Sequence, residues 1–332
     1  MGRLADWTVE QYNADCTHVR SSELKDIAGK RGPREYYFKH VEPTLPEELL
    51  SAMYPHGRPE PPHKAPSVDL LLGTLFHDWV LRGIVGWYVS DARVNSDAGR
   101  RATRANLGKI RLTSKDADKL HGWREAIDQS PEATDILQGG MSEQTFLWED
   151  DTGIPCKARM DLWQFATGKK VDIKTTRHAT REGFDRQATE LKYYLSAAHY
   201  TAGEASVEGF DDSWLRNDFS HLVLCKEYPY AAYVFPVARE WMDIGRRQCR
   251  EALDHLANCR AKHAALMRQI ESLAVEELPA RGAEIKRAML SCWPDWIAQD
   301  QEYPVSPSVW QVEALAFKAI DCTEPLELTP SP

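Results

Sequence analysis

The chain has 332 residues, of which 42% are hydrophobic, 27% charged and 10% aromatic. This composition is typical of a globular protein with a large core, and it excludes disorder over the whole length and any collagen-like or coiled-coil repeat. The formal net charge of −9 excludes a basic protein that simply coats nucleic acid, so any such contact must be confined to a local patch.

Three further features bear on the cellular environment. The opening stretch MGRLADWTVEQYNAD lacks an apolar signal core, so secretion by that route is not expected. The most apolar stretch, residues 68–89, is interrupted by Asp69, His77, Asp78 and Arg82, which argues against a membrane span. The seven cysteines are widely spaced and include no Cys-x-x-Cys pair, which favours a reducing cytoplasm over a disulfide framework or zinc finger.

The first third of the chain is predicted to be helical. Residues 1–45 favour short helices, one of them capped by Ser21 or Ser22, and the prolines between Pro43 and Pro66 predict a loop. Residues 67–85 predict a buried helix, and Thr113 or Ser114 is expected to cap a helix over 113–128. The apolar positions of the first of these two helices are Leu70, Leu71, Phe76, Val80 and Leu81.

Strand patterns begin after residue 143. Three runs, 145–148, 154–165 and 170–175, are separated by glycine-containing turns and predict an antiparallel meander. A helix over about 181–202, two strands at 222–225 and 231–235, and a helix over about 238–273 follow. This order predicts an α/β fold with a central mixed sheet flanked by helices and with helical N-terminal decoration. We divide it into an N-terminal helical and proline-rich segment (1–66), a core (67–275) and an acidic C-terminal extension (276–332).

The chemistry is concentrated in Asp161 and the run Asp172-Ile173-Lys174. Residues i and i+2 of a strand share a face, so Asp172 and Lys174 are expected to point together while Ile173 faces the core. If Asp161 lies on the neighbouring strand, two carboxylates meet, and a magnesium ion would relieve their repulsion. Lys174 would then act on a metal-bound water or on transition-state charge. An ordinary Asp–Lys pair on a surface hairpin is the alternative.

Two outlying residues extend this group. Glu143 precedes the first strand, and His77 lies on an otherwise apolar helix in Gly73-Thr74-Leu75-Phe76-His77. A neutral imidazole can bind magnesium- or manganese-type ions, although a core histidine and a solvated strand-edge acid are the simpler interpretations.

In this order the motifs resemble the PD-(D/E)XK nucleases, and within them the RecE (exonuclease eight) catalytic domain. The resemblance spans about residues 10–270. It is carried by Leu72-Gly73-Thr74-Leu75-Phe76-His77, Ile110-Arg111-Leu112-Thr113, Trp148-Glu149-Asp150 through Asp161, Asp172-Ile173-Lys174-Thr175-Thr176, and Tyr193-Tyr194 through Tyr200.

The resemblance implies a restriction-endonuclease-like core and Mg²⁺-dependent hydrolysis of DNA, with Mn²⁺ able to substitute. It implies an exonuclease that digests linear duplex DNA from its ends, 5′ to 3′, and leaves 3′ overhangs for a single-strand annealing partner, and an assembly into homo-oligomeric rings. Asp161, Asp172, His77, Glu143 and the Ile173 carbonyl would be metal ligands. Lys174 would be the catalytic lysine, and Tyr193 would reach the site or simply pack the helix on the sheet.

The chain departs from the family pattern at three positions. Met160 stands where a proline is frequent, Arg82 where a glutamate is common, and Ser196 where related nucleases carry glutamine. In a helix Tyr193, Ser196 and Tyr200 share a face, so that face still reaches the site, but a serine extends less far.

The segment from 91 to 115 is basic and predicts phosphate contacts, an exposed solvated loop being the alternative. The DNA-binding candidates are Arg93, Arg100, Arg101, Arg104, Lys109 and Arg111. Trp79, Trp87 and Trp123 offer either stacking on bases or core packing.

The alternatives in function are another nuclease of the same fold, of endonuclease or iron–sulfur type, and a non-catalytic DNA-binding scaffold. An iron–sulfur cluster is not expected, because the cysteines that would bind it are spread out along the chain (Cys249, Cys259, Cys292, Cys322). A non-catalytic scaffold is not expected, because Asp161, Asp172 and Lys174 are all present.

Overall fold

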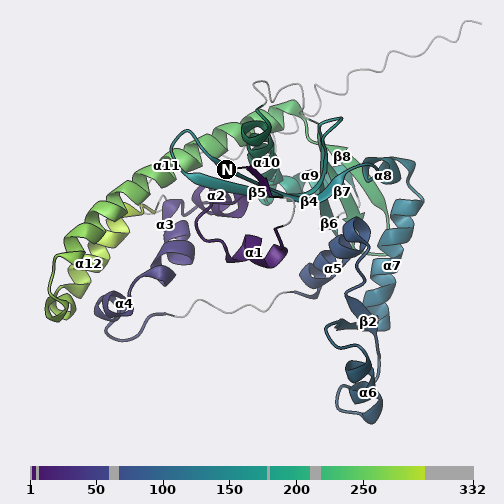
Figure 1. Cartoon of the computed structure of the whole chain (residues 1–332), viewed down its shortest axis with the longest axis horizontal. Coiled ribbons are helices and arrows are strands. Elements are labelled where there is room, and N and C mark those ends of the chain that lie inside the picture. Colours follow the sequence, from purple (N-terminus) through teal and green to yellow (C-terminus); the bar gives the residue numbers. More distant parts are fainter. Residues whose placement is uncertain (1, 5–6, 60–66, 178–179, 210–217, 296–332) are drawn as a thin grey trace, which may run out of the picture.

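A computed structural model describes residues 2–4, 7–59, 67–177, 180–209 and 218–295 (Figure 1). A six-stranded sheet with the order β1-β4-β5-β6-β7-β8 forms its centre. All neighbours are antiparallel except β6 and β7, which are parallel, so the predicted mixed sheet is confirmed. The strands are β1 Gly2–Leu4, β4 Met141–Glu149, β5 Pro155–Gln164, β6 Lys169–Thr176, β7 Phe219–Cys225 and β8 Ala232–Pro236.

The predicted meander is β4, β5 and β6. The turn between β4 and β5 needs a left-handed residue, which Gly153 supplies at φ 77°. Parallel strands require a crossover, and α9 (Arg181–Glu190) and α10 (Tyr193–Glu208) form it between β6 and β7. The single helix expected over 181–202 is therefore wrong, because Lys192 adopts φ 50° and breaks it in two.

Helices cover both faces of the sheet, as expected (Figure 1). Side chains of β4 and β5 pack on one face against a group of helices that includes α10, and side chains of β5, β6 and β7 pack on the other. The helices of the first face are α2 (Ser21–Ile27), α3 (Pro33–Tyr36), α4 (Glu47–Met53), α10, α11 (Arg239–Glu271) and α12 (Leu278–Cys292). Those of the second face are α5 (Val68–Arg82), α7 (Ser114–Asp128) and α8 (Pro131–Ile136).

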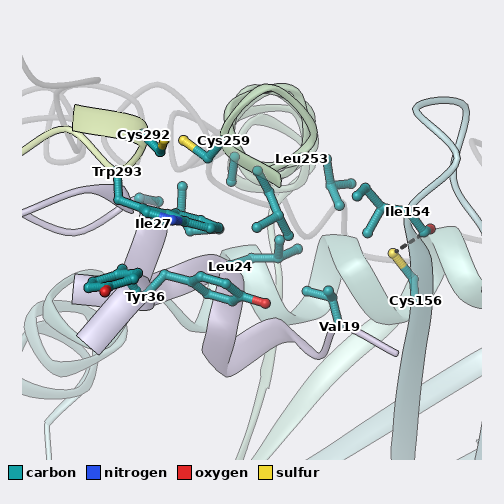
Figure 2. Packing of buried hydrophobic residues seen from close by; sticks show 14 of the residues in the cluster. Val19, Leu24, Ile27, Tyr36, Ile154, Cys156, Leu253, Cys259, Cys292 and Trp293 are labelled. Carbon is teal, nitrogen blue, oxygen red and sulfur yellow. Dashed lines mark hydrogen bonds between the residues drawn. The ribbon is translucent and has the colours of Figure 1, made fainter. Parts of the chain in front are cut away.

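The larger core lies between α2, α3 and α11 (Figure 2). Leu24 and Ile27 of α2 are fully buried there, beside Leu253 of α11. Trp293 follows α12 and stacks on Tyr36 with ring centroids 5.7 Å apart. Residues 278–293, within the predicted C-terminal extension, thus contribute buried side chains to this core, whereas residues 296–332 lie outside the described part of the chain.

Two local expectations are wrong and one is confirmed. Ser21 is the first residue of α2 rather than its cap, and Arg20 precedes it without a side-chain capping bond. In α5 the expected position Leu70 is 62% exposed and Leu72 and Leu75 are buried, whereas Phe76 is buried and Leu71, Val80 and Leu81 pack against the core as expected. The reason is that α5 turns its first residues toward a cavity rather than toward the sheet. Thr113 caps α7, as expected.

A basic arm projects from the body of the molecule (Figure 1). It consists of the parallel pair β2 (Trp87–Val89) and β3 (Ile110–Leu112) and of α6 (Asp97–Ala105) at its far end. The remaining described elements are α1 (Val9–Ala14), a π-helical turn Tyr37–Val41 and 3₁₀ turns Glu42–Thr44 and Val275–Glu277. None of the described helices has the length and apolar character needed to cross a membrane.

Candidate active site

The two motif strands lie side by side and bring the predicted residues together. Asp161 is on β5, and Asp172 and Lys174 are on the adjacent β6. Lys174 Nζ donates to Asp172 Oδ1 at 2.6 Å, so the two side chains share a face as the i, i+2 spacing predicts. Ile173 between them is 3% exposed and packs in the core of the opposite face. Its backbone N–H donates to Asp161 Oδ2 at 2.7 Å and thereby fixes that carboxylate.

His77, Glu143 and Asp161 form a cluster of metal-ligating groups. One ligand atom from each lies within 4.8 Å of the other two, and His77 Nδ1 is 3.6 Å from Asp161 Oδ2. His77 comes from α5, which crosses over the sheet at this point. Of all the described residues, only these three form such a group.

Glu143 reaches this cluster through an unusual backbone conformation. Its φ is 55°, in the left-handed region that a non-glycine residue rarely adopts. Its neighbours Ser142 and Gln144 pair with Leu162 and Met160, so Glu143 lies opposite Asp161 across the β4–β5 ladder. Such a conformation costs about 1–2 kcal/mol and is commonly retained at functional sites.

Arg159 holds the Glu143 carboxylate in place. Its Nε donates to Glu143 Oε2 at 2.6 Å, and its Nη1 donates to the Trp7 carbonyl at 2.8 Å and to Thr145 Oγ1 at 3.1 Å. Arg159 lies two residues before Asp161 on the same face of β5. It therefore links the cluster to the N-terminal segment.

Asp172 is held from a second side by His221. Nδ1 of His221 lies 3.1 Å from Asp172 Oδ2, and both side chains are almost fully buried. Burial raises the pKa of Asp172, but Lys174 and His221 outweigh it and hold that pKa well below its usual range. Asp172 is thus ionised beside the cluster, although it is not one of the three grouped ligands, and its role as a metal ligand stays a prediction.

The pKa of Asp161 moves the other way. Burial raises it to about 6, and the neighbouring carboxylates of Asp172 and Glu143 add to the effect, against His77 and Lys174. Burial lowers the pKa of Lys174, but the attraction of Asp172 and Asp161 prevails and the pKa is raised. The site contains more buried negative charge than its own cations neutralise, which is the condition that a divalent cation relieves.

Tyr193 lies between two lysines. Lys174 Nζ is 5.2 Å from the centroid of its ring and Lys25 Nζ is 5.4 Å from it. Burial and the nearby Lys174 lower the pKa of Lys25 to about 8. Gln187 of α9 donates from Nε2 to Tyr193 Oη at 3.1 Å and to the Thr175 carbonyl at 3.1 Å.

Ser196 does not take the place of the glutamine found in related nucleases. It is 7% exposed and its hydroxyl bonds Ser21 of α2 at 3.2 Å. Gln187, from the preceding helix, lines the cavity instead.

One cavity of about 1510 Å³ is lined by several of these groups, namely His77, Glu143, Arg159, Asp161, Lys174, Gln187 and Tyr193. Trp7 through Asn13 form one wall, α5 a second and α9 a third. The cationic side chains that line it are Arg82, Arg159, Lys174, Arg177, Arg186 and Lys226. A cavity of this size with converging acids and cations suits a phosphate-containing polymer better than a small apolar ligand.

The basic arm does not line this cavity in the described part of the chain. Arg93, Arg100, Arg101, Arg104 and Lys109 are exposed on it. Arg111 differs, because its guanidinium donates to the carbonyls of Ser90 and Ala92 and so holds the arm together. The tryptophans pack rather than stack in solvent: Trp123 and Trp87 are buried, and Trp79 packs against Trp87 at 5.9 Å.

His221, Arg159 and Gln187 were missed by sequence reasoning. A polar residue inside a buried strand is the available signal for the first two, since β5 and β7 are otherwise almost entirely buried. Gln187 carries no such signal.

A mixed sheet that places Asp161 beside Asp172-Ile173-Lys174, facing His77 and Glu143, is the arrangement of a PD-(D/E)XK-like domain. A family model described as "PDDEXK-like domain of unknown function (DUF3799)" matches residues 54–271, and the chain belongs to this family. Among solved structures the chain is similar to the one named "Putative exonuclease" from Eubacterium rectale. The two share 16% sequence identity at a TM-score of 0.47, over 87% of this chain and 89% of that chain. No curated protein matches the chain.

The residues present fit a divalent metal. Two carboxylates and one imidazole within 4.8 Å are ligands that a divalent metal accepts. A cation there would also favour the ionised form of Asp161, whose pKa is raised by burial and further by the carboxylates of Asp172 and Glu143. His77, Glu143 and Asp161 would hold the ion.

Proposed function

We propose that this protein is a metal-dependent DNA exonuclease that hydrolyses phosphodiester bonds from the ends of linear duplex DNA, 5′ to 3′, and leaves 3′ overhangs. One observation carries the proposal: the His77–Glu143–Asp161 cluster stands next to the Asp172–Lys174 pair in a cavity lined by cations. The preferred ion is Mg²⁺, with Mn²⁺ able to replace it.

Each residue of the site has a role in hydrolysis that follows from its position. When bound, the metal polarises the phosphate and acidifies an attacking water. Lys174 keeps its proton because Asp172 lies 2.6 Å away, so its ammonium is ready to stabilise negative charge on the phosphate oxygens or to hold the water. The ring of Tyr193, at the start of α10, lies beside the Lys174 ammonium and orients it, and Gln187 of α9 holds Tyr193 through its hydroxyl.

Two further proposals concern the assembly of the exonuclease and its partner. We propose that copies of the chain form a ring around DNA and that a single-strand annealing protein receives the 3′ overhang. Exposed apolar side chains on the arm, Val94 at 65% and Leu107 at 82%, are a candidate surface for such a contact. Light scattering coupled to size exclusion gives the number of copies, and a monomer at micromolar concentration would overturn the ring.

The decisive experiment compares linear and closed circular duplex DNA, with Mg²⁺, with EDTA, and with Asp172→Ala. The expected result is loss of linear DNA alone, abolished by EDTA and by the substitution, with strand-specific labels reporting 5′ to 3′ digestion. Asp128→Ala is the matched control, since that acid pairs with Arg124 on the exposed side of α7. Cutting of the circle would replace the proposal by an endonuclease of the same fold. Cleavage that persists in EDTA would overturn the metal-dependent mechanism, and absent cleavage would overturn the nuclease itself.

A further inference from the structure

Three cations from separate elements converge on one carboxylate, Asp69, in the first turn of α5. Arg177 Nη2 and Lys226 Nζ each donate to Asp69 Oδ2 at 3.3 Å, and Lys119 Nζ lies 3.6 Å from Oδ1. Arg177 follows β6, Lys226 follows β7 and Lys119 lies on α7. We call these four residues the Asp69 cluster.

The position of the cluster is set by the parallel strand pair. Thr176 and Cys225 are paired at the ends of β6 and β7, and the next N–H, that of Lys226, donates to the Thr176 carbonyl at 2.7 Å. Arg177 and Lys226 are therefore neighbours just past the carboxyl ends of the two strands. Asp69, Arg177 and Lys226 all line the active-site cavity.

A purely structural role would not require three cations around one carboxylate. One carboxylate balances one cation, and exposed ion pairs contribute only about 0–1 kcal/mol each. Here three mutually repelling cations surround a single acid, which leaves an excess of two positive charges. Arg177 is also 70% exposed, so its guanidinium can leave Asp69 without breaking any packing.

We propose that the Asp69 cluster binds a phosphate of the DNA strand, and that the Asp69 carboxylate occupies the place of that phosphate in the free protein. The inference rests on the proposed function, because it takes the polymer in the cavity to be DNA. Lys119, Arg177 and Lys226 turn to the incoming phosphate, and Asp69 tempers their affinity so that the strand can move on.

Two separate segments of the chain give a similar distance between the Asp69 cluster and the active-site residues. Asp69 precedes His77 by eight residues of α5, or about 12 Å at the rise of an α-helix. Arg177 follows Lys174 by three residues, or about 10 Å along a strand. The Asp69 cluster therefore meets a phosphate within a few nucleotides of the bond that is cut.

The test measures binding of a 3′-fluorescein-labelled 20-base-pair duplex by anisotropy, in EDTA, across a series of salt concentrations. Arg177→Ala and Lys226→Ala are each expected to weaken binding about threefold to tenfold and to reduce the salt slope by about one. Asp69→Asn is expected to strengthen binding about threefold, since it removes the internal competitor. Arg124→Ala and Asp128→Asn, a surface pair on α7, are the matched controls and should change neither quantity.

The outcomes separate this inference from the proposed function. Weaker binding by Asp69→Asn, or wild-type binding by both cation variants, would overturn the phosphate site even if the enzyme digests DNA normally. The expected pattern in a protein that cleaves no DNA would retain the site and overturn the nuclease. No binding by the unaltered protein would overturn the phosphate site, while digestion with Mg²⁺ decides the nuclease separately. Duplexes with a 5′-hydroxyl or a 5′-phosphate distinguish a backbone phosphate, which gives equal effects, from a terminal one.

Discussion

Nδ1 of His221 lies 3.1 Å from the carboxylate of Asp172, although 49 residues separate them in the chain. They are directly paired across the parallel strands β6 and β7, so their side chains share one face of the sheet. The His221 ring is packed against Phe184 and Tyr193, which fixes its orientation. Asp172 is consequently held on one side by an imidazole and on the other by Lys174.

His221 is expected to act as a positioning residue for Asp172. His221→Ala should lower kcat about tenfold to a hundredfold with little change in KM, the range found when an orienting partner is lost. His221→Asn keeps a polar nitrogen near Nδ1 and should restore most of the rate. Steady-state digestion of linear DNA measures both, and thermal unfolding checks folding. Equal losses in the two variants, matched by equal losses in Tm, would reduce His221 to a structural role.

Metal binding should depend on the three grouped ligands. His77→Ala, Asp161→Asn and Glu143→Gln are each expected to weaken Mn²⁺ binding by more than the roughly tenfold loss that follows removal of an orienting group. Calorimetric titration of Mn²⁺ into the protein measures this without any turnover. Asp128→Asn, which removes an exposed acid on α7, is the control. Unchanged affinity in the Glu143 variant would exclude that residue from the metal site.

Arg159 should affect the metal through Glu143. Arg159→Met removes the 2.6 Å bond to the Glu143 carboxylate and is expected to weaken Mn²⁺ binding about tenfold. Arg159→Lys keeps the charge but not the three-way bonding and should give an intermediate value. Calorimetric titration of Mn²⁺ tests this role of Arg159. Identical Mn²⁺ affinities in both variants and in the unaltered protein would show that Arg159 does not affect metal binding.

His199 is expected to make folding stability sensitive to acid. Burial lowers its pKa from 6.5 to about 4, and its Nε2 lies 3.0 Å from the Lys157 carbonyl. The unfolded chain therefore binds more protons than the folded protein between these values. The contribution of the neutral, buried His199 to the free energy of unfolding is complete above pH 6.5. It is lost as the pH falls toward 4, which lowers that free energy by roughly 3 kcal/mol.

Urea unfolding at pH 7, 6, 5 and 4 measures this loss. His199→Gln cannot titrate, so its free energy of unfolding should fall less steeply with acid than that of the unaltered protein. Carboxylates that titrate in the same range are common to both and cancel in the difference. Parallel pH profiles would show that His199 does not change protonation on unfolding.

The basic arm should bind DNA without regard to sequence. Replacing Arg101, Arg104 and Lys109 by alanine is expected to weaken binding of several unrelated duplexes equally and to reduce the salt slope by up to about three. The control replaces three exposed cations of α11 and α12, Lys262, Arg268 and Arg287. In Figure 1, α12 lies on the opposite side of the molecule from the basic arm. Equal effects of the two triple variants would mean that only net charge matters.

The chain alone determined the parts of the site that depend on local periodicity. The alternation of a strand places Asp172 and Lys174 on one face with Ile173 in the core, and glycine turns at short spacing predict the hairpins that bring Asp161 alongside. These relations follow from backbone geometry over a few residues, so they can be derived without knowledge of the rest of the fold.

The remaining parts depend on contacts between distant segments. A crossover of two helices pairs β7 with β6, and only this register brings His221 to Asp172 and Lys226 to Arg177. The left-handed Glu143 and the break at Lys192 are backbone states that the residue types disfavour, so the folded surroundings must impose them. Propensity and periodicity describe a few neighbouring residues, whereas the packing of α5 over the sheet decided that His77 completes the cluster and that Asp69 gathers three cations.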